Sequence, residues 1–422
     1  MKLLIRNGRI IDPANGVDTR GDVCLAEGKI VAVGTAAQDF AAERILDATG
    51  MLVLPGLVDL AARLPKADMY AALAGGVTSL AMPPDIEPVL DTPEHVHAFR
   101  KDFEALTSAQ CQHKPKVYPL GAMTMGLGGQ ALTEMVGLTE AGCVGFSQAS
   151  VPIQDTVVLL HAMQYAASFD YALWLRPQDY WLSRGGVMAN GAYASRLGLE
   201  AIPVEAETIA LQTLLSLQRA TGVRLHLCRL SSAESITLVR TAKREGLAVT
   251  CDVAANNVHL TDVDIGFYDT NLRLDPPVRG QRDRDAIGYG LLDGTIDAIC
   301  SDHTPVADKD KQLPFAQAMP GAIGIELLLS LTLKWAQEAR VPLSEALKLV
   351  TCRPGQILGV PAGTLRVGAS ADLCVVDPQA YWYVCRDTLL SQYTHTPFLG
   401  RELPGRVQAT VLHGEIVWER SV

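Results

Sequence analysis

Short runs of alternating apolar and polar residues, separated by turn residues, mark both ends of the chain. Residues 2–12, 21–34 and 44–56 show this pattern, and Asn-Gly and Glu-Gly pairs between the runs favour tight turns. Residues 363–377 and 405–419 repeat it. We therefore expect antiparallel hairpins at both ends, joined into one small β-sandwich domain.

The middle of the chain alternates helical patterns with short runs that are apolar throughout. Such runs are typical of parallel strands buried on both faces. They lie at 52–60, 76–83, 116–123, 141–148, 171–177, 223–232, 247–254 and 296–305. The pattern predicts an α/β fold, a (β/α)8 TIM-like barrel inserted into the sandwich, with its chemistry at the C-terminal strand ends. The expected domains are residues 1–54, 55–362 and 363–422.

Composition narrows the classes of partner. The net charge is −10 and the pI is near 5.4, so no basic face is expected and nucleic acid is excluded as a partner. No run reaches the roughly 18 apolar residues of a membrane span, and polar residues interrupt the first apolar run before it reaches signal-peptide length. We expect a cytoplasmic protein without a membrane partner.

Nine cysteines are scattered singly, without a Cys-x-x-Cys pair. Most lie inside apolar runs, where a thiol behaves as a small hydrophobic group. The sequence therefore gives no indication of a thiolate zinc site.

Several long motifs resemble the dihydroorotase branch of the cyclic amidohydrolases, and the resemblance covers nearly the whole chain. They are "PGLVD" at 55–59, "AALAGGVTSLAMP" at 71–83, "AGCVGF" at 141–146, "GVMANG" at 186–191, "DPPVR" at 275–279, "DGTIDAICSDHTP" at 293–305 and "TPFLGRELPG" at 396–405. The resemblance implies an amidohydrolase barrel. It also implies two metal ions at the strand ends, held by a His-x-His pair, a carboxylate, two further histidines and an aspartate.

Most of these ligands are absent when the resemblance is followed residue by residue. The six metal-site positions fall on Ala61, Arg63, Gln148, Arg176, Arg229 and Asp302, of which only Asp302 keeps the residue of the family. Two substrate-contact positions fall on Pro65 and Pro84. We expect vestigial metal and substrate sites, no bound metal, no cofactor and no catalytic residues.

Two histidine-containing segments do not supply the missing metal ligands. His226 lies three positions before Arg229, and residues three apart on a strand point to opposite faces, so we expect the two side chains to diverge. The His-x-His of "EHVHAF" at 94–99 follows a helix-start signal, where residues i and i+2 do not share a face.

Three arginines, like Asp302, fall at the C-terminal ends of the predicted barrel strands. A buried carboxylate without a counter-charge is strongly destabilising, so one of Arg63, Arg176 and Arg229 is expected to pair with Asp302. Two alternatives remain: the arginines reach solvent at the barrel mouth, or they form a site for a small anion.

The lost ligands lead us to expect a non-catalytic homologue rather than an enzyme. By resemblance, it would be an assembly subunit for an aspartate transcarbamoylase catalytic chain in pyrimidine biosynthesis, and itself a homo-oligomer, a dimer. One alternative is an active, dihydroorotase-like amidohydrolase with an atypical or single-metal site, in which Asp302 and His303 form a proton-shuttling pair. The other is a small-anion sensor.

Overall fold

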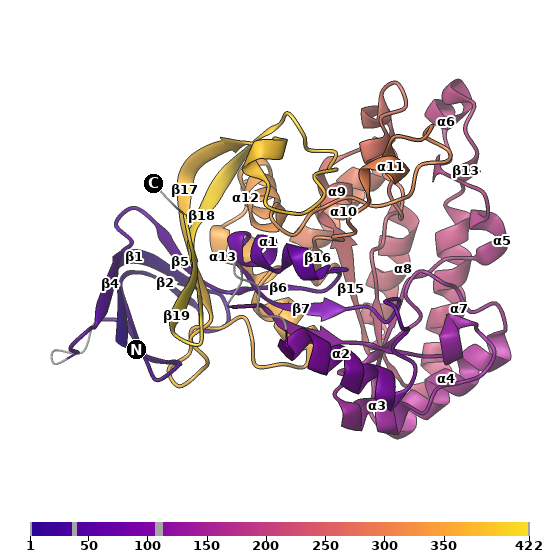
Figure 1. Cartoon of the computed structure of the whole chain (residues 1–422). Coiled ribbons are helices and arrows are strands. Elements are labelled where there is room, and N and C mark those ends of the chain that lie inside the picture. The colour runs from indigo at the N-terminus through magenta and orange to yellow at the C-terminus, as the bar shows by residue number, and fades with distance from the viewer. Residues whose placement is uncertain (1, 36–39, 106–112, 421–422) are drawn as a thin grey trace.

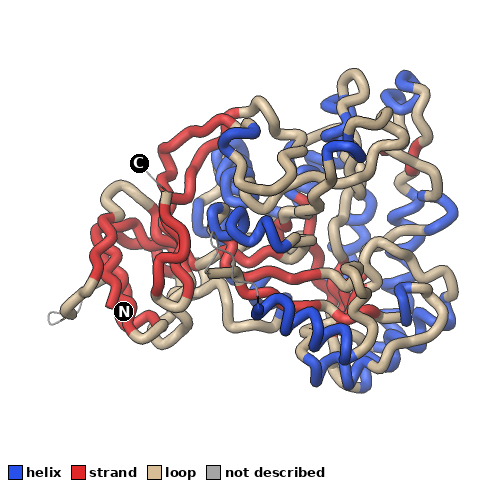
Figure 2. Tube along the Cα trace, in the orientation of Figure 1, coloured by secondary structure: helices blue, strands red, loops and turns tan. Residues whose placement is uncertain are grey.

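The computed structural model describes residues 2–35, 40–105 and 113–420. It consists of a β-rich domain built from both chain ends and a larger α/β barrel (Figure 1). The strands gather into one sheet at the side of the termini, and helices surround a second set of strands (Figure 2). The predicted fold class is therefore confirmed.

The terminal domain is one sheet with the strand order β19-β18-β17-β5-β1-β2-β3, in which β4 pairs with β1. Strands β1 and β5 are parallel, whereas β5 and β17 are antiparallel, so strands from the two ends of the chain meet at the centre of the sheet. The strands are β1 (Lys2–Asp12), β2 (Val17–Ala26), β3 (Lys29–Gly34), β4 (Arg44–Asp47), β5 (Leu52–Pro55), β17 (Leu373–Tyr383), β18 (Glu402–Leu412) and β19 (Glu415–Glu419).

The barrel strands are parallel and follow one another in chain order, as the eight apolar runs predict. The third run is divided by Leu120 into the consecutive strands β8 and β9. The strands are β6 (Leu57–Asp59), β7 (Val77–Met82), β8 (Lys116–Pro119), β9 (Gly121–Ala122), β10 (Phe146–Ser147), β11 (Ala172–Leu175), β14 (Arg224–Leu227), β15 (Val249–Ala254) and β16 (Ala298–Cys300).

The helices cover the outside of the barrel, and their sequences explain where they begin and end. In α8, Ser232 caps the first turn by accepting a hydrogen bond from Ser235 N, and Ile236, Val239 and Ala242 form the buried face. The main helices are α1 (Met69–Ala74), α2 (Pro93–Ala105), α3 (Met135–Ala141), α4 (Thr156–Ser168), α5 (Tyr180–Ser183), α7 (Glu205–Thr221), α8 (Ala233–Arg244), α10 (Gln281–Leu292), α12 (Leu328–Ala339), α13 (Leu343–Lys348) and α14 (Cys352–Leu358).

Shorter elements complete the loops. They are α6 (Ala192–Leu197), α9 (Ala255–His259), α11 (Asp308–Lys311), β12 (Met188–Ala189), β13 (Ala201–Ile202) and the 3-10 turns η1 (Lys66–Asp68), η2 (Met125–Leu127), η3 (Asp262–Ile265), η4 (Thr270–Leu272) and η5 (Arg386–Thr388). Within the described ranges, no helix combines the length and the apolar character that crossing a membrane requires.

The run at 52–60 belongs to both domains, which corrects its assignment to a single barrel strand. Pro55 pairs with Leu373 in the terminal sheet, whereas Leu57 pairs with Val77 in the barrel. Gly56 lies at the change of direction, where a Cβ atom would stand 2.1 Å from Thr78 Oγ1. The chain passes between the domains at a position where only glycine fits.

The first and last barrel strands meet through side chains. Ser301 N donates to Asp59 Oδ1 at 2.9 Å, the Ser301 hydroxyl donates to the same carboxylate, and Ala62 and His303 form a parallel bridge. Asp59 is fully buried, and burial raises the pKa of its carboxyl to about 6. This contact closes the ring at the end where the candidate site lies.

Candidate functional site

The candidate site lies at the C-terminal ends of the barrel strands, where Arg229 and Asp302 form a buried ion pair. Arg229 follows β14 and Asp302 follows β16, and Arg229 Nη1 donates to Asp302 Oδ1 at 2.7 Å. Their side chains are 7% and 8% exposed. Burial alone would lower the pKa of Arg229, but the Asp302 carboxylate raises it, so the guanidinium is charged. The expected arginine partner of Asp302 is therefore Arg229.

Arg176, at the end of β11, pairs with another carboxylate. Its two terminal nitrogens donate to the two oxygens of Asp275 at 2.5 Å each, which is a bidentate arrangement. Burial opposes ionisation of Asp275, but the Arg176 charge prevails and lowers the pKa of Asp275 to about 2. Asp275 lies in the "DPPVR" motif, so it belongs to the resemblance although the sequence reading gave it no role.

Arg63, after β6, completes the arginine set. Its Nε and Nη2 donate to Asp85 Oδ2 at 3.0 and 2.7 Å. Ser150 Oγ lies 3.4 Å from Arg63 Nη2 and 3.3 Å from Arg229 Nη2, so one hydroxyl links two of the guanidinium groups. Each of the three arginines faces one aspartate in this part of the structure. This charge balance disfavours the anion-sensor alternative.

The remaining predicted positions are occupied by local structure. The carboxamide of Gln148 exchanges hydrogen bonds with Thr124 Oγ1 and donates to Leu127 O. Ala61 contributes backbone bonds, among them its carbonyl accepting from His303 N at 3.2 Å. Pro65 precedes the turn η1, and the Pro84 carbonyl accepts from Leu90 N at 3.1 Å. None of these four residues offers an imidazole or carboxylate, whereas the neighbouring Asp85 does.

The side chains of His226 and Arg229 bind different carboxylates, Asp252 and Asp302. His226 Nε2 lies 2.9 Å from Asp252 Oδ2, and Arg229 N donates to Asp252 Oδ1 at 2.6 Å. Strand β14 ends at Leu227, and Arg229 has a φ of 54°, so alternation does not extend to it. Asp252 is therefore shared by the imidazole of His226 and the backbone of Arg229, while the Arg229 side chain binds Asp302.

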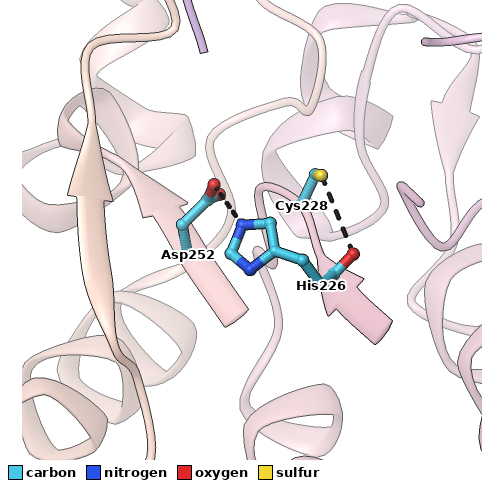
Figure 3. Close-up of side chains that lie close together, drawn as sticks. All are labelled: His226, Cys228 and Asp252. Atoms are coloured by element: carbon cyan, nitrogen blue, oxygen red, sulfur yellow. Dashed lines mark hydrogen bonds and ion pairs between the residues drawn. The ribbon is translucent and has the colours of Figure 1, made fainter. Parts of the chain in front are cut away.

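His226, Cys228 and Asp252 form a group of metal-ligand type (Figure 3). One donor atom from each lies within 4.8 Å of the others. Imidazole nitrogen, thiolate sulfur and carboxylate oxygen are all zinc ligands. His226 Nδ1 lies 2.9 Å from Thr250 Oγ1, a contact that orients the ring. Sequence reasoning missed this group because it treated the cysteines of apolar runs, Cys228 among them, as small hydrophobic residues.

Two other histidine predictions have clear outcomes. His303 does not face Asp302: its Nε2 lies 3.2 Å from Asp68 Oδ2, and its Nδ1 accepts from Gly324 N at 3.2 Å. The expected proton-shuttling pair is therefore wrong. The "EHVHAF" segment is helical, within α2, as predicted.

Eight of the nine cysteines lie in the described ranges, six of them buried and two partly buried. The ninth, Cys111, falls outside those ranges. Burial raises the pKa of several of these thiols, including Cys143 and Cys374, each to about 12. These two cysteines are inert packing residues, as the sequence indicated.

Two family models match the chain. A model described as "Dihydro-orotase-like" matches residues 50–235, and one described as "Amidohydrolase family" matches residues 186–417. Together they span the barrel and most of the C-terminal strands.

Curated relatives match over their full lengths. A "Dihydroorotase-like protein" of Pseudomonas aeruginosa is 39% identical, over 99% of this chain and 100% of its own length. A "Dihydroorotase" of Geobacter sp. (strain M21) is 36% identical over the same shares. Among solved structures, an L-hydantoinase (dihydropyrimidinase) from Arthrobacter aurescens superposes with a TM-score of 0.86 at 24% identity, covering 99% of this chain and 96% of its own. That similarity supports the fold.

These findings overturn the expectation that the chain is not an enzyme. Full-length relatives at 36–37% identity carry the name dihydroorotase, which is the name of a hydrolase. The expectation rested on five lost ligand positions and on the rejection of His226 and of the 94–99 segment as substitutes. His226, Cys228 and Asp252 nevertheless form a group of metal-ligand type.

Proposed function

The chain belongs to the dihydroorotase-like amidohydrolases, and on that premise we propose that it hydrolyses the amide bond of a cyclic amide. In this reaction water adds to the carbonyl carbon, the ring C–N bond breaks, and the leaving nitrogen takes up a proton. The observation that carries the proposal is the full-length match, which includes both the barrel and the terminal sheet, to relatives named dihydroorotase.

The two-metal site implied by the family does not fit the residues at the six expected positions. A guanidinium has donors only and cannot bind a cation, and three of the six positions are arginines that face aspartates. We therefore derive no step through a metal pair. The proposal corresponds to the atypical, single-metal alternative.

His226, Cys228 and Asp252 are donors that could hold one zinc ion, provided that His226 Nε2 and Asp252 Oδ2 give up their mutual hydrogen bond and the Cys228 thiol, whose pKa burial raises, loses its proton. When bound, such an ion would polarise a carbonyl group and lower the pKa of a bound water molecule. The chain's own contribution is to orient these donors: Thr250 holds the imidazole of His226, and Arg229 N holds the second oxygen of Asp252.

Asp302 is the proposed proton acceptor from the attacking water. It is the only one of the six positions with the family's residue, and Arg229 fixes its carboxylate at the strand end. The ion pair with Arg229 holds this carboxylate in the candidate site, where it is placed to accept a proton.

The test is a ring-opening assay with 5,6-dihydroorotate and 5,6-dihydrouracil, with and without added Zn²⁺. We expect turnover that depends on zinc and is lost in Cys228→Ser and Asp302→Asn. Cys143→Ser is the matched control, because Cys143 is buried in another part of the barrel and should keep full activity. Absence of turnover of either compound by the folded, zinc-supplemented protein would refute the proposal.

We also propose that the chain associates with an aspartate transcarbamoylase catalytic chain and that it forms a dimer with itself. Both rest on the sequence resemblance and are independent of whether the barrel turns over a substrate. Co-expression followed by size-exclusion chromatography with mass determination tests both. Separate elution of the two chains contradicts the first, and a monomer mass contradicts the second.

A further inference from the structure

A small cavity lies at the seam between the terminal sheet and the barrel. Its wall combines residues of β17 and β18 with residues at the start of α12, the helix against which β18 packs (Figure 1). Its volume is about 20 Å³, above the roughly 10–15 Å³ that one water molecule requires. The space therefore suits a compact ion rather than a larger ligand.

Two arginines line this cavity, Arg406 on β18 and Arg420 directly after β19. Among the residues that the structure describes, neither arginine has an ion-pair partner. Arg420 Nε donates to Val407 O at 3.2 Å, and Arg406 Nε is buried without a partner. The terminal nitrogens Nη1 and Nη2 of both side chains thus remain as donors for a ligand.

Two indole rings hold the guanidinium groups in place. Arg406 Cζ lies 5.1 Å from the centre of the Trp382 ring, and Arg420 Cζ lies 4.9 Å from the centre of the Trp418 ring. Trp382 is itself fixed, because its Nε1 donates to Ser330 Oγ at 3.1 Å. Stacking occupies the face of a guanidinium and leaves the N–H groups at its edge free. The two arginines are therefore positioned before any ligand arrives.

The charge at the cavity is unbalanced. Burial and the neighbouring Arg406 lower the pKa of Arg420 to about 10, against the effect of Glu326, so Arg420 is still charged near neutral pH. Glu326 also lines the cavity, but its carboxylate accepts from Leu390 N, Ser391 N and Ser391 Oγ and forms no ion pair with either arginine. Two neighbouring guanidinium groups repel each other, and an anion between them relieves this repulsion.

An ion that matches this site is compact, negatively charged and rich in oxygen atoms. Guanidinium groups bind phosphate and carboxylate oxygens through short, charge-assisted N–H···O bonds. We propose that the cavity binds a free phosphate-type oxyanion, held between Arg406 and Arg420 where the terminal sheet meets α12. The inference goes beyond the proposed function, because the cavity shares no residue with the candidate site at the barrel strand ends.

The experiment is isothermal titration calorimetry of the full chain with inorganic phosphate, at an ionic strength held constant with sodium chloride. We expect saturable binding of one phosphate per chain. The unfolding temperature should rise with phosphate and not with sodium chloride of equal ionic strength, because the ion binds the folded chain. Phenyl phosphate should bind at least about tenfold more weakly, because its ring exceeds the cavity.

The variants test whether the two arginines hold the ion. Arg406→Gln and Arg420→Gln should each weaken phosphate binding at least about tenfold, because each removes charge-assisted hydrogen bonds. Arg353→Gln is the matched control and should bind as the parent does, because Arg353 is exposed on α14 and does not line the cavity. Arg406→Lys keeps the charge and loses the planar pair of donors, so it should also weaken binding, and it replaces Arg406→Gln if that variant folds poorly.

Several results would overturn the proposal. They are the absence of saturable phosphate binding, unchanged affinity in both Arg406→Gln and Arg420→Gln, and an equal loss of affinity in Arg353→Gln. Tighter binding of phenyl phosphate than of phosphate would show that the site does not select a free ion. The ring-opening assay does not bear on these results, so the two proposals stand or fall separately.

Discussion

Removing the Arg229 side chain should destabilise the protein far more than removing an exposed arginine. In Arg229→Met, the Asp302 carboxylate loses its partner while its side chain remains about 8% exposed. Breaking a buried pair from one side costs about 3–5 kcal/mol, since an uncompensated charge is left behind. The exposed pair Arg219–Glu245 is 45% and 44% exposed, and a comparable change there costs about 0–1 kcal/mol.

A double-mutant cycle isolates the pairwise contribution. Asp302→Asn is the second change, because Asp302 has a φ of 50° and asparagine tolerates this conformation. The double variant buries no net charge, so it should be more stable than Arg229→Met alone, with a coupling of about 2 kcal/mol or more. The free energy of unfolding from urea titrations, measured for this cycle and for Arg219→Met with Glu245→Gln, gives both couplings. Equal couplings in the two cycles would refute the idea that the barrel mouth depends on Arg229 for charge balance.

Three further predictions concern pH and packing. Because Arg176 lowers the pKa of Asp275 from 3.8 to about 2, against the effect of burial, this pair contributes about 2 kcal/mol of stability above pH 4 that is lost as the pH falls through 2. Arg176→Gln should remove this stabilisation and move the acid transition, followed by circular dichroism, to higher pH. Burial lowers the pKa of Lys311 from 10.5 to about 7, so stability should rise between these pH values, and Lys311→Met should show no such rise in denaturant midpoints. Gly56→Ala should cost about 1–3 kcal/mol in a urea titration, because its Cβ meets Thr78, and an unchanged midpoint would contradict the close contact.

The fold was predictable because its signals are local. Most barrel strands are runs of apolar residues buried on both faces, with β8 only partly buried, and this pattern does not depend on distant parts of the chain. The expected boundary after residue 54 divides the run at 52–60 between the domains, but the run was also counted as one barrel strand, because apolar character does not tell which sheet buries a residue. The change of sheet depends on the contact between Gly56 and Thr78, which is a tertiary feature.

The site was predictable only in part. Electroneutrality required a partner for Asp302, but it did not select among three arginines. The choice depends on Asp85 and Asp275, which lie 22 and 99 positions from the arginines they bind. The role of Asp252, which binds the ring of His226 and the backbone N of Arg229, was not predicted because Asp252 lies on another strand, 26 and 23 positions from these residues.

Because β5 and β17 pair at the centre of one sheet, that sheet can be completed only late in translation. Pro55 and Cys374 are 319 positions apart, and β5 pairs with β17 only after the ribosome has made most of the chain. At 5–20 residues per second this takes roughly 15–65 s. During that interval the apolar N-terminal strands are exposed while the barrel is already being completed. Truncation after the barrel should therefore leave an aggregation-prone N-terminus, and a separately expressed C-terminal segment should be able to rescue it.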